Sequence, residues 1–300
     1  MDGAVTLHLG LDLGGTNVKW ALVERDGFPR VTAAGSAPTH AHEGPDRVVA
    51  RLAEVGRGAL NGAAPDSVGV GVPGVFDVDS GTTAFLPNLP GDWAGGAVAG
   101  PVGEALGAPA VLVNDARAFA VGESQLGAAL GCRTAVFVTV GTGVGGGVVV
   151  DGHLHLGIGT AGELGHQTVA PDGPLCRCGN RGCVEAVASA EAIASTGGRA
   201  TVEEIVVAAE AGEQRAREAL ERAGRYLGIA LANCVLLLAP ERIVVGGGVA
   251  GAGELLLEPI RAELRQRVRV APVERVDVVP AELGPGAGAI GAALWAAERC

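Results

Sequence analysis

The sequence predicts an α/β protein with mixed sheets and two domains built on one plan. Short β-prone runs alternate with stretches of helical spacing along the whole chain, which is typical of this class. A strand, a glycine-rich turn and a second strand occur in each half, with the turns at residues 14–17 and 141–143. This repetition indicates a duplicated architecture. In addition, 300 residues exceed what one hydrophobic core usually fills, so two domains are expected.

Composition and charge favour a packed protein without a nucleic-acid or membrane partner. Hydrophobic residues make up 48% of the chain and charged residues 18%, as in ordinary globular proteins. The net charge of −11 disfavours a nucleic-acid surface, which needs clustered Lys and Arg. The uncharged runs are broken by glycine or stop short of the ~18 residues of a membrane span. Six cysteines behind a start that lacks a signal-peptide pattern indicate a reducing compartment, so we expect a cytoplasmic protein.

The first half of the chain predicts a hairpin followed by alternating helices and strands. Leu7 to Leu13 and Val18 to Val23 are β-prone runs separated by the first glycine turn, residues 14–17, as in a β-hairpin. The further elements expected here are a helix over 46–60, a strand over 67–72, a strand over 110–113 and a helix from 115 to about 129. We place the join between the domains just after Asp115, so that they comprise residues 1–115 and 116–286.

The second half repeats the hairpin. Residues 135–140 and 145–150 are apolar runs that flank the second glycine turn, residues 141–143. The remaining elements expected are helices over 202–238 with an interruption near Gly212, a strand over 242–245, a helix over 253–266, a strand over 275–279 and a helix from 287.

Three cysteines within eight residues, with a histidine ten positions upstream, predict a structural zinc site. One imidazole and three thiolates complete the tetrahedral set of Zn²⁺ and leave no position open for water. The predicted ligands are His166, Cys176, Cys178 and Cys183. A disulfide loop is the alternative, but a Cys-x-Cys pair is too close to bridge without strain. The carboxylates of Glu163 and Glu185 lie just outside this set, which suggests a site for a hydroxyl-rich ligand.

The two glycine turns are candidate phosphate-binding sites. Glycine lets backbone N–H groups approach phosphate oxygens without an intervening Cβ, and each turn also carries a threonine hydroxyl, on Thr16 and Thr142. A single such turn can serve only the twist of a hairpin, whereas two matching turns can hold a triphosphate. Asp12, next to the first turn, is placed to orient hydrated Mg²⁺; its alternative role is to cap the turn with its side chain.

Asn114 and Asp115 stand at the end of a buried strand and the start of a helix. Ligands of open α/β sheets bind outside the carboxyl ends of strands. Asp115 could serve there as a general base toward an attacking hydroxyl, which is most of what phosphoryl transfer asks of a protein carboxylate. The alternative is that Asp115 only caps the helix.

In this order and spacing, the motifs resemble the ROK family of sugar kinases and repressors, within the hexokinase–actin superfamily. The matching segments are Asp12–Thr16, Leu86–Asn88, Asn114–Arg117, Thr139–Gly147, Gly162–His166, Cys176–Glu185 and Val244–Gly248. The resemblance runs nearly end to end. It implies a two-domain hexokinase/actin-like fold, a duplicated RNase H-like architecture with a deep cleft between the domains. It also implies that the final helix, 287–300, returns to the first domain.

The resemblance also implies roles for individual residues. Asp115 takes the role of base, and the sugar is bound by Asn88, Asn114, Asp115, Glu163, His166 and Glu185. ATP, with Mg²⁺, is bound by Asp12, Gly14, Gly15, Thr16, Asn17, Lys19, Gly141, Thr142, Gly143, Gly246, Gly247 and Gly248. His166 has a second role as a zinc ligand, and the family suggests a homodimer.

We therefore expect an ATP-dependent hexose kinase, with glucose as acceptor and glucose 6-phosphate as product. Glu185 is followed by Ala-Val, where ROK glucokinases often have Gln-Tyr, so other acceptors stay open. These are N-acetylmannosamine, N-acetylglucosamine, fructose and a C7-cyclitol. A sugar-sensing repressor of the same family would carry a helix-turn-helix before Asp12, for which this sequence has no room, and the acidic charge does not suit DNA. A non-catalytic sugar-binding module is disfavoured because Asp115 and both glycine turns are present.

Overall fold

The computed structural model describes residues 4–77, 80–86 and 89–300, and its contacts divide the chain into two compact units. The first unit runs to Gly127 and includes Leu283–Cys300, whereas the second comprises Ala128–Glu282. The division thus falls after Gly127, and not after Asp115 as we predicted. The reason is that α3 (Asp115–Gln125) packs against α9 (Ala287–Arg299) and so belongs to the first unit. Helix α3 also ends at Gln125, short of the predicted Ala129, and is followed by turns.

The main sheet of the first unit has the strand order β3-β2-β1-β4-β8. The β3–β2 and β2–β1 pairs are antiparallel, and the β1–β4 and β4–β8 pairs are parallel. The strands are β1 (Thr6–Leu13), β2 (Asn17–Asp26), β3 (Phe28–Pro38), β4 (Ser67–Val72) and β8 (Ala110–Asn114). The predicted first hairpin is therefore confirmed, while β3 was not predicted. A small separate sheet contains β5 (Val75–Asp77), β6 (Thr82–Phe85) and β7 (Gly96–Ala97).

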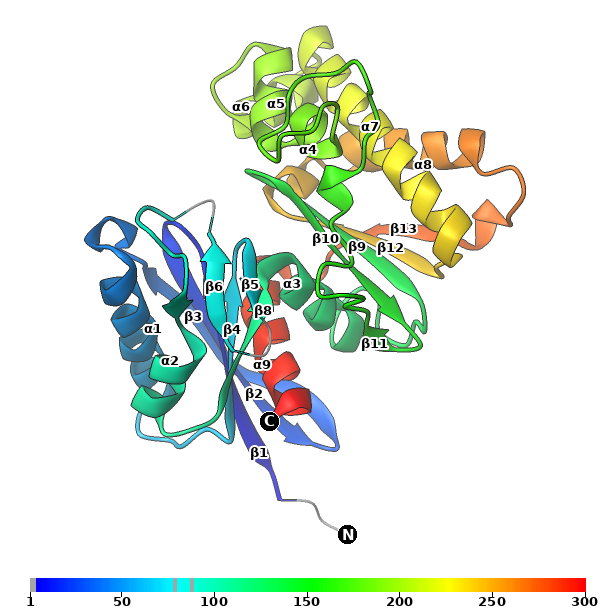
Figure 1. Ribbon diagram of the computed structural model, residues 1–300. Coiled ribbons are helices and arrows are strands. Elements are labelled where there is room, and N and C mark those ends of the chain that lie inside the picture. The colour runs from blue at the N-terminus through cyan, green and yellow to red at the C-terminus, as the bar shows by residue number, and fades with distance from the viewer. Residues whose placement is uncertain (1–3, 78–79, 87–88) are drawn as a thin grey trace. The chain divides into compact units, whose positions relative to one another are not determined.

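Helices cover both faces of this sheet, with α1 (Pro45–Leu60) and α2 (Ala99–Leu106) on one face and α3 and α9 on the other (Figure 1). Because side chains alternate along a strand, successive residues of β1 point toward opposite faces of the sheet. Leu9, Leu11 and Leu13 are fully buried in the core that includes α1. Gly10 faces α9, where an added Cβ would stand 1.8 Å from the carbonyl oxygen of Ala289. The small residues of α9 and of β1 thus bring helix and strand close enough to fix the position of Asp12.

The second unit repeats the first, because its sheet has the order β11-β10-β9-β12-β13 with the same pairing directions. The β11–β10 and β10–β9 pairs are antiparallel, and the β9–β12 and β12–β13 pairs are parallel. The strands are β9 (Ala135–Val140), β10 (Val144–Val150), β11 (His153–Leu154), β12 (Arg242–Gly246) and β13 (Asp277–Pro280). The predicted duplication is confirmed by this match.

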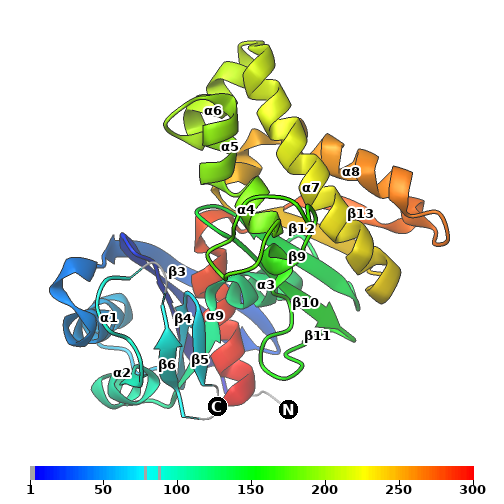
Figure 2. The ribbon, with the colours of Figure 1, turned by 45° about the horizontal axis from the view of Figure 1, so that its top comes forward.

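The helices of the second unit follow residues 166–183 in the chain and cover the sheet of this unit. They are α4 (Val184–Ala188), α5 (Ala190–Gly197), α6 (Val202–Glu210), α7 (Gln214–Leu238) and α8 (Glu254–Arg267). The long α7 packs on α8 and on each of α4, α5 and α6 (Figure 2). Its buried face joins the core of valines from β9 and β12. Within the described part of the chain, we find no helix with the length and apolar character needed to cross a membrane.

Candidate active site

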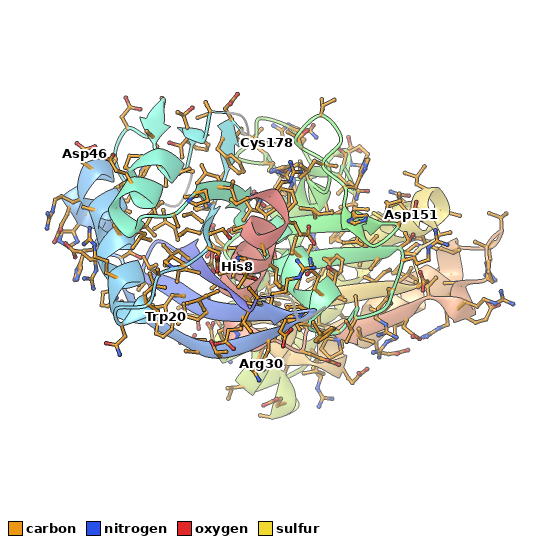
Figure 3. The ribbon with its side chains drawn as sticks, turned by 90° about the horizontal axis from the view of Figure 1, so that it is seen from below. His8, Trp20, Arg30, Asp46, Asp151 and Cys178 are labelled. Atoms are coloured by element: carbon orange, nitrogen blue, oxygen red, sulfur yellow. The ribbon has the colours of Figure 1, made fainter. Side chains whose placement is uncertain are left out.

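The second unit brings the four predicted metal ligands together in the metal loop, residues 166–183. One ligand atom from each of His166, Cys176, Cys178 and Cys183 lies within 4.8 Å of all the others. A backbone hydrogen bond closes the turn between the cysteines, since the N–H of Cys176 donates to the carbonyl of Asn180 at 2.7 Å. Cys176 and Cys183 are buried, and Cys178 is exposed at the surface (Figure 3).

The distances between the ligand atoms fit a tetrahedral Zn²⁺ site. With zinc–sulfur bonds of about 2.3 Å, two sulfurs of a tetrahedral site stand roughly 3.7 Å apart. The Sγ atoms of Cys178 and Cys183 are 3.7 Å apart, and Cys176 Sγ lies 3.8 Å from His166 Nδ1. These separations exceed the ~2 Å of a disulfide, and all three cysteines are free thiols. Burial raises the pKa of the Cys176 thiol to about 12, so metal binding there has to displace a proton.

The two carboxylates beside the metal loop occupy different settings. Glu163 is exposed and precedes the short 3-10 helix Leu164–His166, which places it three residues before a metal ligand. Glu185 is half-buried in the first turn of α4, two residues after Cys183. Its Oε2 accepts a hydrogen bond from the Val144 N–H at 3.0 Å. One of its oxygens is thus already engaged by the backbone that follows the second glycine turn.

The second glycine turn connects β9 to β10 and lies beside the Gly246–Gly248 segment. The N–H of Gly141 donates to the carbonyl of Gly143 at 2.9 Å, which closes the turn. On the neighbouring strand β12, Gly246 is paired with Thr139, one residue before the end of β9. Gly247 and Gly248 follow directly. The structure thus brings two of the three predicted ATP-binding segments together within the second unit.

The first glycine turn is anchored by Thr39, a residue that the sequence analysis missed. Gly14 N–H donates to the carbonyl of Asn17 at 3.0 Å, while Gly15 and Thr16 are exposed. Thr39 is fully buried; its hydroxyl donates to the Gly14 carbonyl at 2.7 Å and its N–H to the Thr16 carbonyl at 2.9 Å. A lone threonine after a strand carries no sequence signal of this role.

Asp12 lies within β1, before the turn, and is paired with Lys19 of β2 across the antiparallel ladder. Its carboxylate faces the start of α9, because a Cβ added at Gly288 would stand 2.7 Å from Asp12 Oδ2. Burial raises the pKa of Asp12 to about 6, against the opposing charge of Lys19. A buried carboxylate near an exposed N–H-rich turn is suited to a cation or to its hydration shell.

Asn114, and not Asp115, is the residue that caps α3. The Asn114 Oδ1 accepts from the N–H groups of Ala116 and Arg117 at 3.1 and 3.3 Å, and its Nδ2 donates to the Gly74 carbonyl at 3.3 Å. Most of the hydrogen-bonding capacity of this buried amide is therefore used within the protein. Asp115 is the first residue of α3 and half-buried, and its Oδ1 accepts from the Ala116 N–H at 2.8 Å.

One predicted sugar ligand, Asn88, lies outside the described residues. The residues that follow it are irregular, and buried Trp93 donates from its indole N–H to the carbonyl of Pro90 at 3.2 Å.

Comparison with known proteins identifies the family. The model of the ROK family matches residues 8–299. The chain belongs to the ROK family. A glucokinase from Thermotoga maritima is 35% identical over 311 residues, with 97% of each protein covered. A ROK hexokinase from Thermus thermophilus has 38% identity and a TM-score of 0.83, covering 98% of this chain and 99% of that one.

A second solved structure is informative because of its ligands. A ROK family glucokinase from Streptomyces griseus, crystallised in complex with glucose and AMPPNP, is 32% identical with a TM-score of 0.83. The match covers 97% of this chain and 99% of that one. These ROK structures confirm the predicted hexokinase-like fold class.

Proposed function

We propose that the chain is an ATP-dependent kinase that transfers the γ-phosphate of ATP to the primary hydroxyl of glucose. The position of Asp115 carries this proposal. Its carboxylate stands at the N-terminus of α3, directly after the buried strand β8, where the cap by Asn114 fixes the backbone. Membership of the ROK family supports the reaction class, and similarity to glucokinases supports the acceptor.

In the proposed reaction the acceptor oxygen forms a bond to the γ-phosphorus while the bond from that phosphorus to the bridging oxygen of ADP breaks. The hydroxyl proton passes to the Asp115 carboxylate, and the electron pair of the broken bond leaves with ADP. Phosphoryl transfer needs positioned reactants and charge stabilisation more than covalent chemistry from the protein. Mg²⁺ bound with ATP would supply part of this charge stabilisation. Asp12 is the residue that we propose to orient the hydration shell of the Mg²⁺.

We assign the remaining contacts by residue type. Asn88, Asn114, Glu163, His166 and Glu185 bind sugar hydroxyls, and the two glycine turns with Lys19 and Gly246–Gly248 bind ATP. The metal loop holds a structural Zn²⁺ through His166, Cys176, Cys178 and Cys183, whose spacing fits it. Metal analysis of the purified protein should find one zinc per chain.

The test of the reaction is ATP consumption against a panel of sugars, combined with the variant Asp115→Asn. Asparagine keeps the size and the helix-end position but cannot accept the proton. We expect kcat to fall by at least ~10²-fold, the usual effect of losing a general base, with glucose binding retained in calorimetry. Glu210→Gln, an exposed change on α6, serves as the matched control and should keep the wild-type rate.

Two results would contradict this assignment in different ways. An Asp115→Asn enzyme with near wild-type kcat would remove Asp115 from the role of base. Consumption of ATP with none of the sugars would remove the kinase function itself.

We further propose a cytoplasmic homodimer. Six free thiols are suited to a reducing compartment. Light scattering of the purified chain would test the dimer, since a monomer at micromolar concentration contradicts it.

A further inference from the structure

Glu185 contacts two parts of the second unit that are assigned separate roles. Its Oε2 accepts from the Val144 N–H, the first backbone group of β10 after the second glycine turn, at 3.0 Å. Its Oε1 lies 3.8 Å from Sγ of Cys176, a thiol of the metal loop. A single carboxylate therefore lies beside the metal loop and hydrogen-bonds to the backbone of the turn.

The carboxylate of Glu185 lies in close contact with Gly143 and Val144. A Cβ added at Gly143 would stand 2.5 Å from Glu185 Oε2, so a side chain at this position would displace the carboxylate. Val144 is buried, and its N–H has this carboxylate as acceptor inside the protein. A hydrogen bond to an ionised acceptor is about twice as strong as a neutral one.

The other end of the turn is held by the same stretch of chain. The carbonyl of Gly141 accepts from the N–H of Ala190, the first residue of α5, at 2.8 Å. Residues 185–190 follow directly on the metal ligand Cys183, which is the N-cap of α4. The position of Cys183 thus decides where α4 begins and, two residues later, where the carboxylate of Glu185 stands.

We propose that Glu185 is a positioning residue that links the metal loop to the second glycine turn, so that zinc binding sets the affinity for nucleotide. This rests on the proposed function, in which that turn binds the phosphates of ATP. Binding of metal orders the loop and the start of α4. An ordered Glu185 then holds the Val144 N–H and the backbone of the turn in the conformation that receives phosphate. Loss of zinc then loosens the turn through Glu185.

The experiment measures the Kd of Mg-AMPPNP by calorimetry without any sugar, so that sugar contacts of Glu185 do not enter. We expect removal of zinc from the wild-type protein by a chelator to raise this Kd about 10-fold, and added zinc to restore it. In the zinc-loaded protein, Glu185→Ala should raise the Kd by a similar factor, and Glu185→Gln by less, because its amide oxygen still accepts. Removing zinc from the Glu185→Ala variant should then raise the Kd little further, since two changes that act through the same contact do not have additive effects.

Hydrogen exchange gives a second readout that does not depend on activity. Peptides covering residues 141–146 should exchange faster after zinc removal and in Glu185→Ala, whereas peptides covering 14–17 of the first unit should not change. Glu210→Ala, exposed on α6, is the matched control and should alter neither Kd nor exchange.

Each outcome bears on the proposal. If zinc removal changes neither the Kd of Mg-AMPPNP nor the hydrogen exchange of residues 141–146, the proposal is wrong, even if the enzyme phosphorylates glucose. If the metal-free chain unfolds, the zinc-loaded variants decide, and an unchanged Kd in both Glu185→Ala and Glu185→Gln overturns it. If the chain phosphorylates no sugar but its affinity for nucleotide depends on zinc, the proposed function is wrong and this inference still holds. A zinc-loaded chain that binds no nucleotide loses both.

Discussion

Single side chains hold the first glycine turn and the groups around it. Asp12 packs its carboxylate against the start of α9, where Gly288 leaves room for it. Thr39 satisfies two carbonyl groups of the turn from the far end of β3.

Asp12→Asn should stabilise the nucleotide-free protein in a pH-dependent way. Burial raises the Asp12 pKa from 3.8 to about 6, so between these values the folded chain holds a proton that the unfolded chain has released. The free energy of unfolding therefore falls as pH rises through that window and stays lower above it. We expect calorimetry to give a Tm a few degrees above wild type at pH 8 and a smaller gain at pH 5. Asp26→Asn, exposed at the end of β2, is the control, and an equal gain at both pH values would contradict the prediction.

Thr39→Val should weaken nucleotide binding more than sugar binding. The substitution keeps the shape but leaves the Gly14 carbonyl without its 2.7 Å hydrogen bond, at a cost of about 1 kcal/mol. We expect the KM for ATP to rise several-fold while the KM for glucose changes less. Thr32→Val on β3, the strand that precedes Thr39, removes a weaker 3.4 Å hydrogen bond and is the matched control. Equal changes in both KM values would mean that Thr39 does not act through the turn.

At the scale of elements, the two places where the chain crosses between units are joined by one side chain. Glu123 of α3 is fully buried, and its Oε1 accepts from the N–H of Leu283, where the chain re-enters the first unit. Gly127, where the chain leaves that unit, lies against the same carboxylate, because an added Cβ would stand 2.2 Å from Glu123 Oε2. The helix that carries Asp115 at its start is thus fixed at its other end to both crossings.

Gly127→Ala should therefore destabilise the protein by about 1–3 kcal/mol, since the new methyl group displaces a buried carboxylate from its partner. Gly58→Ala makes the same chemical change within α1, where nothing lies within 4 Å of the new Cβ. There we expect a gain of roughly 0.5–1 kcal/mol from helix propensity. Urea denaturation of both variants gives the comparison, and the prediction is wrong if both move stability in the same direction.

At the scale of the whole molecule, one sheet topology is used twice with different attachments. Each unit places a glycine turn between its first two antiparallel strands. The first unit follows its last parallel strand with Asp115, and the second unit carries the metal loop. The division of roles that we propose, with the base on one unit and the zinc-ordered carboxylates on the other, follows from these insertions into a common plan.

This division predicts the order of sugar preference. An epimer that inverts one hydroxyl leaves a buried partner unpaired, which costs about 1–3 kcal/mol. We expect kcat/KM for glucose to exceed that for galactose and for allose by at least ~10-fold, at 1.4 kcal/mol per factor of ten. Ala186 and Val187 follow Glu185 where ROK glucokinases often have Gln-Tyr, so the panel should include larger acceptors. If an amino sugar or a cyclitol has a higher kcat/KM than glucose in the panel, the kinase assignment holds but glucose is not the preferred acceptor.

The sequence by itself determined the α/β class, the duplication and the four residues of the metal loop. These features are local: strand and helix periods repeat within a dozen residues, and the three cysteines lie within one loop. Only the tertiary structure decided that Asn114 caps α3, that the units divide after Gly127, and that Thr39, Glu123 and Glu185 form hydrogen bonds with Gly14, Leu283 and Val144. Their contacts join residues 25, 160 and 41 positions apart. A hydrogen bond between distant residues depends on how the sheets and helices pack, and it leaves no periodic pattern in the chain that makes it.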